Sequence, residues 1–158
     1  MITEFVLAWY ANKETLEEYF RTTEQREYFQ YEDIVRRLFV DVINPYLEEN
    51  GETSFDTENL HIINDGEYQG CQLFIIPKDT HQPSPYQYVW THESYGSCSG
   101  CDLLQEIQSD GEEYGGLPTE NQVKQYMGLA LNLLQRCRYM IDRETYWNEM
   151  FEQKEDEK

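Results

Sequence analysis

The sequence predicts an α+β fold, in which a small antiparallel sheet of about three strands is covered on one face by helices from both termini. Two patterns support this prediction. Apolar residues near both ends of the 158-residue chain recur every three or four positions, as on one face of a helix. The middle of the chain instead holds short β-branched and aromatic runs separated by turn residues. The length fits a single domain, which we assign to residues 1–150, with a solvated acidic tail at residues 151–158.

The N-terminal third is predicted to be helical. After an apolar opening at residues 5–10, a short helix is expected at Glu14–Thr22 and a longer one from about Glu24 to Ile43. Apolar residues of the longer segment follow helical spacing: Tyr28, Tyr31, Val35, Leu38 and Val42. Asn44-Pro45 is expected to break or kink this helix, because proline disfavours the helical conformation in the residue before it. Asn50-Gly51 is expected to end the last turn.

Three strands are predicted in the middle of the chain. Residues 59–64 and 71–77 are expected to form a hairpin around a longer loop at residues 65–70. Residues 81–85 are expected to form a rigid loop, because they include two prolines within three positions. Residues 86–95 alternate well enough to form the third strand, and residues 96–100 form a turn.

Helices are predicted again after the sheet. Asp102 is expected to cap a short helix that ends near Asp110-Gly111, with Gln105 as its reciprocal capping partner. The longest helix is expected to begin at residues 118–120 and to run on through Trp147 and Phe151. Its apolar stripe is regular: Val123, Met127, Ala130, Leu134, Cys137 and Ile141.

The composition is strongly acidic, with 31 Asp and Glu against 12 Lys and Arg and a formal net charge of −19. Aromatic residues make up 15 % of the chain, which is too many for a disordered acidic tail. A negative surface repels phosphate, which argues against direct nucleic-acid binding and against anionic membranes. No apolar run approaches the roughly 20 residues that span a bilayer, and the N-terminus lacks the features of a signal peptide. We therefore expect a cytoplasmic protein.

The excess charge lies mainly in the middle of the chain. Between Leu38 and Val123 there are 16 acidic residues and one basic residue, Lys78. If they share one face, these carboxylates could occupy a basic groove in place of DNA, which carries about one charge per 1.7 Å of axis. The same charge is also typical of a surface that only maintains solubility. The candidate residues for contact with a basic partner are Asp65, Glu67, Glu93, Asp102, Glu106, Asp110, Glu112 and Glu113.

Cys98-Ser-Gly-Cys101 is the clearest local motif, and three interpretations of it remain open. Two thiolates on a tight turn could begin a zinc site. Its further ligands would come from Cys71, Cys137, His61 or His92. A following helix N-terminus could instead lower a thiol pKa for redox chemistry, although the stretch from Asp79 to Val123, which holds eight acidic residues including Asp79 and no basic one, opposes this. The third interpretation is a structural turn with buried free thiols.

Residues 95–102, YGSCSGCD, followed by Leu103-Leu104-Gln105, resemble a segment of uncharacterised small acidic proteins encoded by bacteriophages of Gram-positive hosts. The resemblance extends from about Tyr86 to Ile107. It implies a phage context, in which small acidic proteins block host enzymes and several anti-restriction and anti-CRISPR proteins mimic nucleic acid.

The predicted function is therefore a non-enzymatic inhibitor of a host nucleic-acid-handling or defence protein, with no cofactor. One alternative is a protein organised around a zinc site or a redox-active thiol pair at Cys98 and Cys101. Another is a virion or assembly component.

Overall fold

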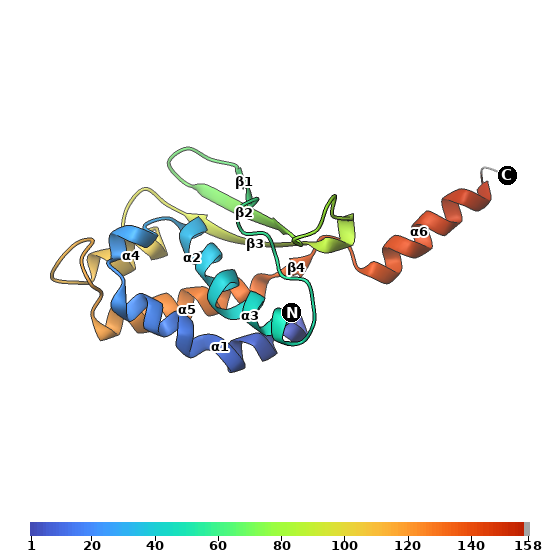
Figure 1. Ribbon diagram of the computed structural model, residues 1–158. Coiled ribbons are helices and arrows are strands. Elements are labelled where there is room, and N and C mark those ends of the chain that lie inside the picture. The colour runs from blue at the N-terminus through green and yellow to red at the C-terminus, as the bar shows by residue number, and fades with distance from the viewer. Residues whose placement is uncertain (157–158) are drawn as a thin grey trace.

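The computed structural model describes residues 1–156, and the side chains of residues 1–152. Its body has two layers, a four-stranded antiparallel sheet and a set of helices on one face of that sheet (Figure 1). The strands follow one another in sequence order: β1 (His61–Asn64), β2 (Gly70–Pro77), β3 (Tyr88–Tyr95) and β4 (Arg138–Tyr139). The predicted α+β class is confirmed, with four strands rather than three. None of the described helices is both long enough and apolar enough to traverse a bilayer.

The first helix, α1 (Thr3–Thr22), is longer than predicted because it includes the apolar opening of the chain. Phe5, Ala8 and Trp9 are buried on the same helix as Leu16 and Phe20. The apolar opening and the helix predicted at Glu14–Thr22 are therefore one helix with a single buried face.

The predicted long helix at 24–43 is divided into turns of different pitch. A 3₁₀ turn at Gln25–Tyr28 precedes α2 (Tyr31–Leu38), and a π-helical turn at Phe39–Ile43 leads directly into α3 (Asn44–Glu49). All five apolar residues of the predicted stripe are buried. The expected break at Asn44-Pro45 does not occur, because the chain stays helical from the π-helical turn into α3, but that turn interrupts the regular α-helix directly before this pair. The expected stop is confirmed at Gly51, whose φ of +74° suits glycine.

The sheet confirms the predicted hairpin and adds one short strand. In the β1–β2 ladder, Ile62 pairs with Phe74 and Asn64 pairs with Gln72. The long helix α5 (Glu120–Arg136) ends earlier than predicted, because the chain after it turns extended and pairs as β4 along β3. Trp147 and Phe151 therefore belong to a separate helix, α6 (Arg143–Asp156), which projects away from the body (Figure 1).

The core lies between the sheet and the helices. Phe74 and Ile76 of β2, with Val89 and Thr91 of β3, are buried toward the helices, whereas the alternate residues of these strands are mostly half-buried on the opposite face. An aromatic cluster joins the helices, with ring centroids 5.0 to 5.3 Å apart in the pairs formed by Phe20, Tyr28 and Tyr126. The face of the sheet that packs against the helices therefore contributes the buried residues of the core.

The acidic tail predicted at residues 151–158 starts inside α6. Phe151 and Glu152 are exposed, and the helix continues to Asp156. Residues 157 and 158 lie outside the described residues.

Candidate functional site

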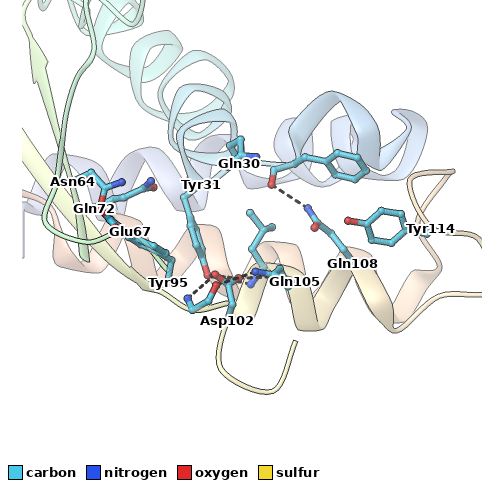
Figure 2. Close-up of a pocket in the computed structure, with 13 residues that line it drawn as sticks. Gln30, Tyr31, Asn64, Glu67, Gln72, Tyr95, Asp102, Gln105, Gln108 and Tyr114 are labelled. Carbon is cyan, nitrogen blue, oxygen red and sulfur yellow. Dashed lines mark hydrogen bonds between the residues drawn. The ribbon is translucent and has the colours of Figure 1, made fainter. Parts of the chain in front are cut away.

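The helix-facing side of the sheet becomes polar at one end, and a cleft opens there. Along β2, the inward positions run from Ile76 and Phe74 to Gln72, and β1 ends on this side with Asn64. Facing these side chains are the start of α2 and the short helix α4 (Leu103–Ser109). The cleft between them has a volume of about 430 Å³ (Figure 2). Aromatic and amide side chains predominate in its lining: Phe29, Gln30, Tyr31, Asn64, Glu67, Gln72, Tyr95, Gly96, Asp102, Leu104, Gln105, Gln108 and Tyr114.

The floor of the cleft is organised by the carboxylate of Asp102. Its Oδ1 accepts hydrogen bonds from the Tyr31 hydroxyl at 3.2 Å and from the Gln105 backbone N–H at 2.9 Å. Its Oδ2 accepts the Gly96 N–H at 3.0 Å. The Tyr31 hydroxyl in turn accepts the Leu104 N–H at 3.1 Å, and burial raises the Tyr31 pKa above its ordinary value. This network ties α2, the end of β3 and the start of α4 to one buried carboxylate.

The predicted helix cap at Asp102 is confirmed, but the reciprocal part of the predicted capping pair is wrong. Asp102 accepts the Gln105 N–H, as a helix-capping residue does. The Gln105 side chain points elsewhere, and its Nε2 donates to the Gly96 carbonyl at 3.0 Å. The Gln105 side chain therefore bonds the loop that precedes the helix and not the backbone of the N-cap residue Asp102.

The cleft is lined mainly by uncharged polar side chains and has no positive charge. Gln105 and Gln108 each donate one N–H of the side-chain amide to a backbone carbonyl, of Gly96 and Phe29 respectively, and no donor to either Oε1 is found among the described residues. Glu67 lies exposed at the edge, and none of the 13 lining residues is Lys, Arg or His. Tyr114 stacks on Phe29 with ring centroids 5.4 Å apart, which supplies an aromatic wall.

Most of the candidate acidic residues gather at this end of the molecule. The β1–β2 loop, α4 and the α4–α5 loop all lie at the end opposite to α6 (Figure 1). The exposed candidates are carried by these three segments: Asp65, Glu67, Glu106, Asp110, Glu112 and Glu113. The structure thus brings the acids of two sequence-distant stretches, residues 65–67 and 106–113, to the end of the molecule where Glu67 lines the cleft.

Two of the predicted contact residues, Glu93 and Asp102, are buried, so neither offers a free carboxylate to a partner. Glu93 points inward from β3 and forms an ion pair with Arg136 at the end of α5. Asp102 is used by the network described above. No sequence pattern indicates the Glu93–Arg136 pair, because the two residues are 43 positions apart.

Basic residues from the N-terminal helices approach the acidic end, but they are paired. Arg26 forms an ion pair with Glu24 at 2.8 Å and donates to the Gly115 carbonyl at 3.4 Å. Arg21 pairs with Glu120 at 2.9 Å. Neither of these arginines is paired with one of the six exposed candidates.

The four cysteines do not converge on one site. Cys98 and Cys101 are both exposed, with Sγ atoms 2.9 Å apart, so the interpretation as buried thiols is wrong for this pair. Cys71 is half-buried and Cys137 is buried. Within residues 1–156, no three side chains among His, Cys, Asp and Glu are grouped so that they could hold a metal ion. The further zinc ligands proposed from Cys71, Cys137, His61 or His92 therefore do not assemble with the pair.

No protein-family model, curated protein or solved structure matches this chain. The site is therefore interpreted from its own geometry. Tyr31, Gln105 and Gln108 were not predicted as residues of a cleft. Tyr31 was placed on an apolar helical stripe, and the glutamines carried no pattern that marks a binding residue.

Proposed function

We propose that this protein is a non-enzymatic, phage-type inhibitor whose acidic end binds a basic surface of a host nucleic-acid-handling or defence protein in the host cytoplasm. The main support is the cleft, whose lining lacks a positive side chain, at the end of the molecule whose loops and short helix carry six exposed candidate carboxylates. A formal charge of −19 makes the whole chain unsuited to phosphate. A basic protein surface that normally binds phosphate groups would be attracted to the negative charge of this chain.

In this proposal the carboxylates and the cleft have different roles. Asp65, Glu67 and the acids of α4 and the α4–α5 loop steer the partner during its approach, and this attraction weakens as salt is added. A lysine or arginine side chain of the partner then enters the cleft. There the free Oε1 atoms of Gln105 and Gln108 accept its N–H groups, and the aromatic wall provides a stacking surface.

The test compares two charge-reversed variants that carry the same net charge. The first variant combines Glu67→Lys, Glu106→Lys, Glu112→Lys and Glu113→Lys at the acidic end. The control combines Glu14→Lys, Glu48→Lys, Glu49→Lys and Glu58→Lys, which are exposed and lie outside the cleft. Tagged wild type and both variants are used to capture proteins from a bacterial lysate at low and high salt, and association rates are measured with the purified partner.

The expected result is capture of a nucleic-acid-handling protein at low salt, with association slowed at least about tenfold by the first variant and much less by the control. Equal slowing by both variants would show that net charge alone is responsible. Unchanged binding by the first variant, or recovery of a virion component as the specific partner, would refute the proposal.

A further inference from the structure

The loop between β3 and α4 brings two thiols into contact at the surface. Cys98 and Cys101 are both exposed, and their Sγ atoms are 2.9 Å apart. A disulfide bond has an S–S length of about 2.05 Å, so the sulfurs need to approach by roughly 0.9 Å to form one. The remaining cysteines are half-buried Cys71 and buried Cys137.

The loop backbone holds the pair in this position. The Cys101 N–H donates to the Cys98 carbonyl at 3.0 Å, and the Cys98 N–H donates to the Cys101 Sγ at 3.2 Å. Gly96 leaves room for this arrangement, because a Cβ on it would lie 2.6 Å from the Cys101 Sγ. The loop is fastened at Gly96 by Asp102 and Gln105, which join it to the cleft floor.

The local donors favour the thiolate of Cys101. Hydrogen bonds from the Cys98 side chain and backbone, with further ones from Ser97, lower the Cys101 pKa below its ordinary value. The acidic residues of this stretch predict a raised pKa, but no carboxylate is among the main causes of the shift. By contrast, burial raises the pKa of Cys71, and it raises that of Cys137 to about 12.

We propose that Cys98 and Cys101 form a thiol–disulfide exchange site that reacts with small-molecule disulfides of the glutathione class, with Cys101 as the attacking sulfur. The Cys101 thiolate attacks one sulfur of the disulfide, forms a mixed disulfide and releases one equivalent of the small thiol. The Cys98 thiolate then attacks the Cys101 sulfur and releases the second equivalent. The protein dithiol is oxidised by two electrons and the small disulfide is reduced to two thiols. Thiol–disulfide exchange at this loop does not require the proposed binding function, although Asp102 and Gln105 connect the loop to the cleft floor.

The experiment treats the reduced, full-length protein with glutathione disulfide at neutral pH, removes samples over time, alkylates the remaining thiols under denaturing conditions and maps them by peptide mass spectrometry. We expect an internal Cys98–Cys101 disulfide, while Cys71 and Cys137 remain alkylated. The Cys98→Ser variant should accumulate a mixed disulfide on Cys101. The Cys101→Ser variant should form one on Cys98 several-fold more slowly, because its remaining thiol lacks the donors that serve Cys101.

Several outcomes would overturn the proposal. One is glutathione bound separately to Cys98 and Cys101 with no internal bond in the wild type. Another is equal reaction of all four cysteines, which would indicate general unfolding. A third is one zinc ion per purified chain that protects both thiols until a chelator removes it. Because the wild-type result does not depend on how the variants fold, the proposal stays testable even if a serine variant is unstable.

Discussion

Replacing Asp102 with asparagine should destabilise the protein, although asparagine is itself a good helix-capping residue. The carboxylate accepts three hydrogen bonds from Tyr31, Gln105 and Gly96 while it is buried. An asparagine that keeps its oxygen toward Tyr31 and Gln105 turns its NH₂ group toward the Gly96 N–H. Two donors then face each other, and the Gly96 N–H loses its acceptor.

The expected loss follows from the bond that disappears. A hydrogen bond to a charged group contributes about 1.5–3 kcal/mol, and a buried donor left without an acceptor costs about 1–3 kcal/mol. Because these contributions overlap, Asp102→Asn should lower the free energy of unfolding by about 2–4 kcal/mol. For a domain of this size, that corresponds to a fall in Tm of roughly 5–15 °C.

The measurement is urea unfolding followed by far-UV circular dichroism and tryptophan fluorescence. Asp110→Asn is a matched control, because Asp110 is exposed and its carboxylate accepts a bond only from the Asn121 side chain among the described residues. It should change the free energy of unfolding by less than about 0.5 kcal/mol. If Asp102→Asn falls within about 0.5 kcal/mol of this control, the carboxylate network does not hold the cleft together.

Three further predictions concern other parts of the fold. Burial raises the pKa of Cys137 from 9.0 to about 12, so the unfolded chain loses this proton first and stability should fall between about pH 9 and 12, by up to about 1.4 kcal/mol per pH unit. Urea titrations should show a shallower fall for Cys137→Val, and parallel slopes would contradict this reasoning. Tyr126→Phe should lower the free energy of unfolding by about 1–2 kcal/mol, because it removes a buried 2.6 Å bond to Gln25; an unchanged urea midpoint would argue against it. Gly128→Ala should raise the Tm and increase the free energy of unfolding by about 0.5–1 kcal/mol, because a Cβ there meets nothing within 4 Å. Gly66→Ala should lower the Tm, because its Cβ would lie 2.0 Å from the Gln69 carbonyl oxygen. The opposite order of the two Tm values would refute this reasoning.

The elements with a strong local pattern could be predicted from the sequence. The hairpin of β1 and β2 follows from two β-branched runs around a polar loop, and the buried stripe from Tyr28 to Val42 follows from helical spacing. The end of α5 could not be predicted in this way. Helical periodicity continues past Arg136, and only pairing with β3, far away in the sequence, makes the next residues extended.

The candidate site was predictable as a charged region but not as a cleft. Charge counting separated the acid-rich middle from the balanced ends of the chain. It did not separate exposed Glu67 from buried Glu93, because burial of Glu93 depends on its ion pair with Arg136 on another element. The acceptor character of Gln105 and Gln108 depends on which backbone carbonyls their nitrogens reach, and that is decided only when α4 packs beside the sheet.

The helix α6 contacts the body mainly through Tyr86, whose ring centroid lies 5.2 Å from that of Tyr146. Trp147 also lies against Tyr86, with ring centroids 6.2 Å apart, but it stays largely exposed, as does Phe151. Fraying or proteolytic removal of α6 therefore uncovers no core residue and leaves the opposite, acidic end as it was. Amide hydrogen exchange in α6 would accordingly report a local opening equilibrium, separate from the cooperative unfolding of the two-layer body.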